Sequence, residues 1–344
     1  MTSSNAPVLQ VEDVHVEFNT RRGKAMVLNG VSFAVHAGET LCVVGESGCG
    51  KSMTALTLLG LVPQPPGRVS GGRVLFAGED LLQATPQRLR AVRGNRISMI
   101  FQEPMTSLNP VFSVGEQIAE SLRLHAGLGR AAAHARAIEM LRQVGIPAPE
   151  RRVDEYPHQL SGGMRQRVMI AIALACRPDI LIADEPTTAL DVTVQAQIFD
   201  LLRELQRERD TAIVLITHDM GAVAEMADRV IVMYAGRVIE QGTAAQVLET
   251  PQHPYTQGLI ACLPELGSNQ QAAPWPFCPG AASSVIGGTS LTQRSCACGQ
   301  RSRKAQPRPS SHSEGTTPGI SASSGRSPCW LLPSSGRQAI RPCV

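Results

Sequence analysis

Aromatic residues and long apolar runs are scarce in this chain of 344 residues. Aromatic side chains make up 3% of the sequence, which argues against a surface that stacks unpaired nucleic-acid bases. The longest apolar run, around residues 168–176, is about half of the roughly 18 residues that a membrane-spanning helix needs. The N-terminus has neither a basic region nor an apolar core, so we expect no secretory signal. We therefore expect a cytoplasmic protein, where a reducing environment makes its nine cysteines poor disulfide candidates.

The net positive charge of the chain comes from its C-terminal part. The net charge is +3, but residues 271–344 hold eight Lys and Arg against the single acid Glu314, a balance of +7. The remaining residues carry 24 basic and 28 acidic groups, a balance of −4. Because the body of the chain is mildly acidic, the sequence argues against a nucleic-acid partner.

Apolar segments alternate with helical patterns over the first 260 or so residues, about the length of one large α/β domain. Residues 8–35 alternate apolar and polar side chains, which predicts an antiparallel sheet, and residues 114–146 have helical spacing. Short apolar strands separated by helices predict a parallel sheet covered on both faces. The further segments that we expect to form strands are 40–44, 73–82, 179–184 and 211–217, with a hairpin that turns at Ala235 and Gly236.

After about Ser268 the periodicity stops. The segment 266–344 is rich in Ser, Pro, Gly and Arg, with fourteen serines from residue 271 on, and its composition predicts disorder. The whole chain has 29 Arg against 3 Lys, which suggests GC-rich coding DNA. Since such DNA read out of frame yields Arg, Ser, Pro, Gly, Ala and Cys, a second hypothesis is that the chain leaves its reading frame near residue 270.

A glycine-rich turn joins the apolar segment 40–44 to a helical pattern. Its sequence fits G-x-x-x-x-G-K-[ST], the phosphate-binding loop in which backbone N–H groups surround the phosphates of a nucleotide. Lys51 is expected to reach the β- and γ-phosphates, and the Ser52 hydroxyl to ligate Mg²⁺. A chance glycine-rich turn is the alternative. The loop consists of Gly45, Glu46, Ser47, Gly48, Cys49, Gly50, Lys51 and Ser52.

Two acidic residues, Asp184 and Glu185, follow the apolar run 180–183. A carboxylate at the carboxyl end of a central strand points into the crevice where open α/β sheets bind ligands. Asp184 suits holding Mg²⁺ through water, and Glu185 suits accepting a proton from the water that attacks the γ-phosphate. The alternative for such a pair is a helix N-cap.

A second anion site is indicated at 160–167, LSGGMRQR. A serine before two glycines suits the start of a helix, whose free N–H groups attract an anion. A simple helix cap is the alternative. Together with the phosphate loop and the acidic pair, this segment resembles the nucleotide-binding subunits of ABC transporters. In that family Leu160, Ser161, Gly162 and Gly163 contact the γ-phosphate of ATP bound to a second ATPase subunit, homologous or identical, so that two chains enclose two ATP molecules.

The resemblance covers about residues 8–265 and implies a fold and further site residues. The fold is α/β: a RecA-like P-loop core, an N-terminal antiparallel β-subdomain and an inserted helical subdomain at about 104–175. Gln102 and His218 match the residues that contact the γ-phosphate, and Gln102 also touches the membrane subunits. The resemblance thus implies Glu185, His218 and Gln102 as catalytic residues and Ser52, Gln102 and Asp184 as Mg²⁺ ligands.

Two further positions follow from the same resemblance. Residues 189–191 match a loop that contacts the second subunit, although Asp191 alone would equally suit a helix N-cap. The family stacks adenine on an aromatic residue of the first sheet. Phe18 is the nearest candidate, while the register of the motif points to Arg22, and Phe18 would equally suit the core.

Finer details resemble the peptide-importer branch: the run 105–110 (MTSLNP), the segment 60–82 and 253–260 (HPYTQGLI). The resemblance implies hydrolysis of ATP that drives uptake of di- and oligopeptides, with nickel or glutathione as alternative cargo. It also implies two transmembrane permease subunits, an indirect extracytoplasmic binding protein, and a peripheral position on the cytoplasmic face of the inner membrane.

Two rival functions are weighed against this one. A soluble ABC ATPase acting on nucleic acid or ribosomes would carry zinc fingers, long coiled coils or tandem cassettes, none of which the sequence shows. A P-loop kinase would lack the LSGG segment. The peptide branch usually has a proline-rich link and a cysteine-containing C-terminal segment, where some members bind an iron–sulfur cluster, so a cluster or a zinc site is an alternative for this region. The spacing here does not resemble that segment, although the region contains Cys278, Cys296, Cys298, Cys329 and Cys343.

Overall fold

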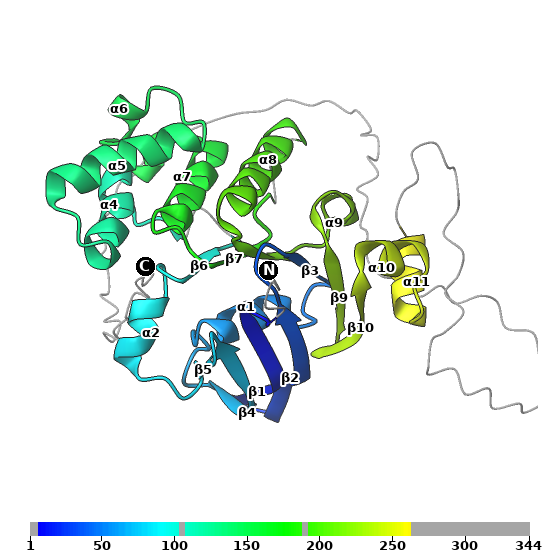
Figure 1. Cartoon of the computed structure of the whole chain (residues 1–344). Coiled ribbons are helices and arrows are strands. Elements are labelled where there is room, and N and C mark those ends of the chain that lie inside the picture. Colours follow the sequence, from blue (N-terminus) through cyan, green and yellow to red (C-terminus); the bar gives the residue numbers. More distant parts are fainter. Residues whose placement is uncertain (1–5, 103–106, 188–191, 263–344) are drawn as a thin grey trace, which may run out of the picture. The chain divides into compact units, whose positions relative to one another are not determined.

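The computed structural model describes residues 6–102, 107–187 and 192–262, which belong to one compact unit (Figure 1). Within that part of the chain, two sheets and the helices that cover them form an α/β fold. No helix in these three ranges is long and apolar enough to cross a membrane.

The first sheet is antiparallel and has the strand order β2-β1-β4-β5. It confirms the sheet predicted over 8–35, and the third strand begins earlier than the predicted 73, at Gly67. The strands are β1 (Leu9–Thr20), β2 (Gly23–Val35), β4 (Gly67–Phe76) and β5 (Glu79–Asp80).

The second sheet has the order β10-β9-β3-β8-β7-β6, and all its neighbouring strands are parallel except the hairpin of β9 and β10. That hairpin turns at Ala235 and Gly236 as predicted. Both residues have positive φ, as the two central residues of a type I′ hairpin turn do. The strands are β3 (Thr40–Val44), β6 (Ile97–Ile100), β7 (Ile180–Asp184), β8 (Ala212–Ile216), β9 (Arg229–Tyr234) and β10 (Arg237–Thr243).

Both faces of the parallel sheet are buried, because successive side chains of β3 enter different apolar clusters. Cys42 and Val44 pack in a cluster with residues of α4, α5, α7, α8 and α9. Leu41 and Val43 pack in another cluster with α1 and with the antiparallel sheet. This arrangement explains why the central strands consist of continuous apolar residues rather than alternating ones.

The helical pattern at 114–146 forms two helices, α4 and α5, rather than one. Gly127 lies between them with φ 64°, a conformation that L side chains rarely adopt, so the first helix ends there. The helices are α1 (Lys51–Leu58), α2 (Pro86–Val92), α4 (Val114–His125), α5 (Arg130–Gln143), α6 (Pro149–Arg152), α7 (Gly162–Leu174), α8 (Val192–Arg209), α9 (Met220–Met226), α10 (Ala244–Glu249) and α11 (Pro254–Ala261), with a 3₁₀ turn at Pro157–Gln159.

Candidate functional site

The predicted phosphate loop connects β3 to α1. Its glycines have left-handed backbone: φ is 147° at Gly45, 85° at Gly48 and 108° at Gly50. A Cβ on Gly45 would lie 2.2 Å from the carbonyl oxygen of Met233, so only glycine fits there. Gly50 precedes α1 without a side-chain cap, which leaves the first N–H groups of the helix available to an anion.

The Lys51 side chain is folded back over the loop. Its Nζ donates to the carbonyl oxygen of Gly45 at 2.7 Å and to that of Glu46 at 3.0 Å. The residue is only 6% exposed, so its charge is held inside the loop rather than in solvent. An ammonium group on neutral carbonyls can exchange them for phosphate oxygens, which bind it more strongly because they are charged.

Asp184 ends β7 as a buried carboxylate that is 3% exposed. Its Oδ1 has no hydrogen-bond partner in the described part of the chain. Burial raises the pKa of Asp184, the Ser52 hydroxyl acts in the opposite direction, and the neighbouring Glu185 charge adds to the increase. A buried carboxylate oxygen beside a serine hydroxyl is a donor set that fits Mg²⁺, which binds few protein carboxylates and takes its other ligands from phosphates and water.

Glu185 lies between Gln102 and His218. The Gln102 amide Nε2 donates to Glu185 Oε2 at 2.9 Å, and His218 Nδ1 lies 3.0 Å from Glu185 Oε1. The three residues follow the neighbouring strands β6, β7 and β8 at their carboxyl ends. The structure therefore brings together the three predicted catalytic side chains, at the sheet edge that also carries the phosphate loop.

The backbone of Glu185 is itself unusual, with φ 50° in the left-handed region. Its N–H donates to the carbonyl oxygen of Ile216 at 2.9 Å, which fixes that conformation. A non-glycine residue in this region costs of order 1–3 kcal/mol and persists only where the surrounding structure holds it. Such residues cluster at functional sites. The catalytic role of Glu185 stays a prediction.

The LSGG segment forms the start of α7. Ser161 is the N-cap, and its Oγ accepts from the Met164 N–H at 3.3 Å. Gly162 is exposed, and a Cβ built on it meets nothing within 4 Å. The fold of this chain alone therefore gives no steric reason for a glycine at this position.

The structure leaves two further predictions open: the loop that contacts the second subunit and the residue that stacks on adenine. The contact loop 189–191 lies outside the described residues. Phe18 packs at the edge of the core, where its ring lies against Gly67 of β4. This contact shows that Phe18 has a packing role. Which residue stacks on adenine stays a prediction.

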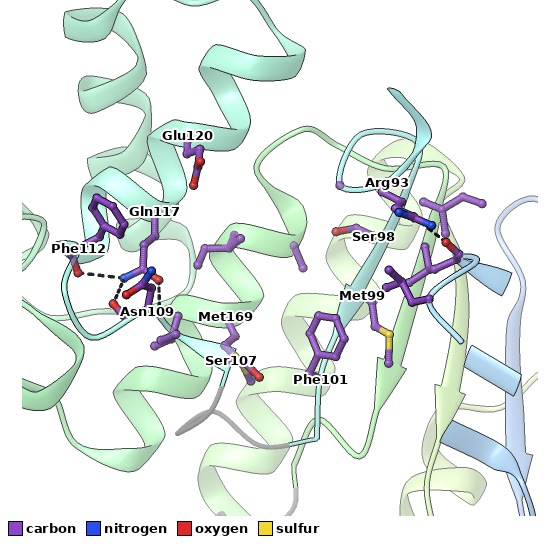
Figure 2. A pocket seen from close by; sticks show the side chains of 17 residues that line it. Arg93, Ser98, Met99, Phe101, Ser107, Asn109, Phe112, Gln117, Glu120 and Met169 are labelled. Carbon is purple, nitrogen blue, oxygen red and sulfur yellow. Dashed lines mark hydrogen bonds between the residues drawn. The ribbon is translucent and has the colours of Figure 1, made fainter. Parts of the chain in front are cut away.

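A mostly apolar cavity of about 180 Å³ lies between β6, α4 and α7 (Figure 2). Phe101 and Met99 line it on the β6 side, and Met169 on α7. The Gln117 side chain shapes the segment before α4: its Nε2 donates to the carbonyl oxygens of Asn109 and Phe112 at 3.0 Å. The ring of Phe112 is 50% exposed. The sequence analysis did not identify this cavity, because no motif marks the residues that line it.

The environment of Asp184 leads to a prediction about stability. Because the pKa is raised in the folded state, the ionised carboxylate is less favourable there than in the unfolded chain. This cost is fully present above the folded-state pKa and disappears as the pH falls toward the unfolded value. Asp184→Asn should therefore raise the free energy of unfolding at neutral pH by about 0.5–2 kcal/mol, the usual gain from one stabilising change.

The measurement is thermal unfolding without nucleotide, at neutral pH and at mildly acidic pH. The advantage of Asp184→Asn should shrink at the lower pH. Asp154→Asn is the matched control, because the Asp154 side chain is 78% exposed and should change stability little. An Asp184→Asn variant less stable than wild type at neutral pH would contradict the prediction.

Comparison with known families gives two matches along the chain. The family described as ABC transporter matches residues 28–188, which include the phosphate loop, the acidic pair and the LSGG segment. The family described as oligopeptide/dipeptide transporter, C-terminal region, matches residues 239–307. This second match extends past residue 270, where the hypothesis of a changed reading frame begins, and the hypothesis stays a prediction.

Characterised relatives share about half of the residues. The dipeptide transport ATP-binding protein DppD of Bacillus subtilis is 53% identical over 262 residues, which is 76% of this chain and 78% of DppD. The oligopeptide transport ATP-binding protein OppD of the same organism is also 53% identical, over 76% of this chain and 73% of OppD. The glutathione import ATP-binding protein GsiA of Pectobacterium atrosepticum is 53% identical, but only 44% of its length is covered.

A solved structure with the same fold is the ATP-binding cassette MJ0796, a dimer in a post-hydrolysis state bound to ADP and Pi. It is 28% identical, has a TM-score of 0.63, and covers 69% of this chain and 98% of its own. The phosphate loop, the acidic pair and the LSGG segment thus occur in a chain whose sequence and fold both match ATP-binding cassettes. The chain belongs to the ABC transporter family and is one of its ATPase subunits.

Proposed function

We propose that this chain hydrolyses ATP to drive the uptake of di- and oligopeptides through a membrane importer. The observation that carries the peptide assignment is the match of residues 239–307 to the C-terminal region of oligopeptide and dipeptide transporters. The relatives DppD and OppD support it, at 53% identity over most of their lengths.

In this proposal the phosphate loop and Lys51 bind the phosphates of ATP. Lys51 would leave the carbonyl oxygens of Gly45 and Glu46 for the β- and γ-phosphates. Glu185 would accept a proton from the water that attacks the γ-phosphorus, while the bond from that phosphorus to the β–γ bridging oxygen breaks and ADP departs. Gln102 and His218 contact the two carboxylate oxygens of Glu185, which supports a role for both in orienting the base beside the γ-phosphate.

Ser52, Asp184 and Gln102 are the residues that we propose to hold Mg²⁺ with the nucleotide. Bound there, Mg²⁺ would neutralise charge on the β- and γ-phosphate oxygens. The described residues contain no cluster of three or more His, Cys, Asp or Glu side chains that could hold a metal alone. A site with one buried carboxylate suits an ion that arrives with ATP.

A second ATPase subunit, identical or homologous, would complete each site with its LSGG segment. The free space around Gly162 and the exposed Ser161 support this arrangement, because an approaching phosphate needs both the open backbone and the hydroxyl. The helix dipole of α7 adds a partial positive charge at the same place.

The two permease subunits would each bind one ATPase subunit, at the cavity lined by Phe101 and Met169. Its apolar lining and the exposed side chains of Val111 (70%) and Phe112 (50%) offer a surface for an apolar segment of a permease. A permease at this place would lie against Phe101, which precedes Gln102 in the chain, and the Gln102 amide contacts the proposed base Glu185. This connection would offer a route from transport to hydrolysis. The chain would then lie on the cytoplasmic face of the inner membrane, with the extracytoplasmic binding protein as an indirect partner.

The test is peptide uptake in cells whose own copy of the gene is removed. Returning the wild-type chain should restore uptake of a labelled dipeptide, and returning Lys51→Ala should not, because the loop loses its charge on the phosphates. Lys24→Ala is the matched control: Lys24 is 62% exposed, pairs with Glu17 at 3.2 Å, and should be dispensable. Uptake by Lys51→Ala cells at the wild-type rate would refute the site. Restoration of nickel or glutathione uptake alone would refute the peptide assignment.

A further inference from the structure

Helix α11 contacts the phosphate loop from the far end of the described chain. The hydroxyl of Tyr255, at the start of α11, accepts a hydrogen bond from the backbone N–H of Glu46 at 3.1 Å. The two residues are 209 positions apart in sequence. Tyr255 lies in the region that matches the oligopeptide/dipeptide transporter C-terminal family, whereas Glu46 lies in the region that matches the ABC transporter family.

The position of Tyr255 is fixed by hydrogen bonds at the start of α11. The Glu240 carboxylate accepts from the backbone N–H of Gln252 at 2.7 Å and from that of His253 at 3.0 Å. His253 Nδ1 in turn accepts from the Tyr255 N–H at 3.1 Å and caps the helix. The ring of Tyr255 lies against that of Tyr234, with 4.7 Å between the centroids. These contacts fix the Tyr255 side chain in the position where its hydroxyl meets the phosphate loop.

The ionisation of Tyr255 also suits a fixed contact. Burial raises the pKa of its hydroxyl, although the Glu46 N–H acts in the opposite direction. The phenol therefore stays neutral at physiological pH. Its oxygen accepts the hydrogen bond from the Glu46 N–H while its own O–H stays intact.

The opposite side of the loop is held by the β9–β10 turn. The Gly236 N–H donates to the carbonyl oxygen of Cys49 at 2.9 Å, and Gly45 lies directly against the carbonyl oxygen of Met233. The Gly45–Glu46 stretch is otherwise held by the two hydrogen bonds that Lys51 donates to its carbonyl oxygens, and by the one that the Cys49 N–H donates to the Glu46 carbonyl oxygen at 3.2 Å. When Lys51 turns to a phosphate, its two bonds are lost, whereas the bond from Glu46 to Tyr255 involves the N–H and can persist.

We infer that Tyr255 is a positioning residue for ATP binding: its hydroxyl holds the first residues of the phosphate loop in the shape that receives the phosphates. This inference rests on the proposed role of residues 45–52. It gives the C-terminal region a direct part in the nucleotide site, because α11 supplies a hydrogen bond that the ABC transporter match at 28–188 does not contain.

The test compares Tyr255→Phe with wild type in the full-length chain. The change removes one hydroxyl and keeps the ring. Amide hydrogen exchange at Glu46 should become at least about fivefold faster, and the Kd for MgATP should rise about three- to tenfold, the usual effect of one lost hydrogen bond. KM for ATP should rise in parallel, with kcat within about twofold. Tyr234→Phe is the matched control, since Tyr234 is 49% exposed and its hydroxyl has no hydrogen bond among those described.

Three outcomes would overturn the inference. These are unchanged exchange at Glu46, an unchanged Kd and KM for ATP, or a loss of thermal stability without nucleotide as the only effect. If Tyr255→Phe does not fold, wild-type chain labelled with fluorotyrosine gives the same test. It has three tyrosines, and the Tyr255 resonance should shift when a non-hydrolysable ATP analogue is added. An unshifted resonance would also overturn it.

The failure of this inference and that of the proposed function are distinguishable. If Lys51→Ala binds ATP as tightly as wild type, residues 45–52 are not the site. If Lys51→Ala loses binding but Tyr255→Phe behaves as wild type, the site is correct and only the role of Tyr255 is wrong.

Discussion

Glu185→Gln should bind ATP as well as wild type and hydrolyse it about 10²–10⁴-fold more slowly, the range for loss of a general base. Glutamine has the same shape and keeps one carbonyl oxygen for the Gln102 amide, which lies 2.9 Å from the carboxylate in the wild type. It cannot accept the proton of the attacking water. The deficit should therefore fall on the chemical step, and ATP should accumulate on the protein and stabilise its dimer.

The measurement is a single-turnover hydrolysis assay, together with equilibrium binding of ATP and the oligomeric state with ATP present. Glu225→Gln is the matched control, because Glu225 is 44% exposed and pairs with Arg203 away from the sheet edge. A Glu185→Gln variant with near-normal turnover would show that another group is the base. A variant that no longer binds ATP would show that Glu185 acts on the loop and not on the water.

Much of this site could be predicted because its parts are local in sequence. The phosphate loop, the acidic pair and the LSGG segment are each a few consecutive residues, and each follows a recognisable strand or begins a helix. Parallel strands bring their carboxyl ends to one edge of a sheet, so Glu185 and His218 were expected to lie together once their strands were recognised. Gln102 was assigned to the same site by the family resemblance alone. The direct contacts of Glu185 with both residues confirm that the three lie together.

Other features depend on contacts that the sequence pattern does not contain. The strand β6 has only four residues, which is too short for a clear period, and the sequence analysis missed it. The pattern at 114–146 gave the helical spacing but not the break at Gly127. The contact between Tyr255 and Glu46 joins positions 209 residues apart, and no local rule predicts such a pair.

If two chains share each ATP site, Gly162→Asp should abolish ATP hydrolysis. A Cβ at this position meets nothing within 4 Å, and an acidic residue in the first turn of a helix is favourable, so the variant should fold and bind ATP at its own loop. Hydrolysis should nevertheless fail, because the new carboxylate would face the γ-phosphate of the ATP on the second subunit and repel it. Gly129→Asp is the matched control: Gly129 also lies at the start of a helix, as the N-cap of α5, and has nothing within 4 Å of its Cβ position.

Mixing the variants tests the shared geometry, provided that this subunit pairs with itself. Gly162→Asp chains and Lys51→Ala chains should each be inactive alone. In a mixed pair one site carries both defects, and the other combines an intact phosphate loop with an intact LSGG segment. Random pairing of equal amounts makes about half of the dimers mixed, so roughly a quarter of all sites should be whole, and hydrolysis should return in proportion. No recovery despite confirmed mixed pairing would mean that each chain uses its own LSGG segment, and the two-chain site would have to be abandoned.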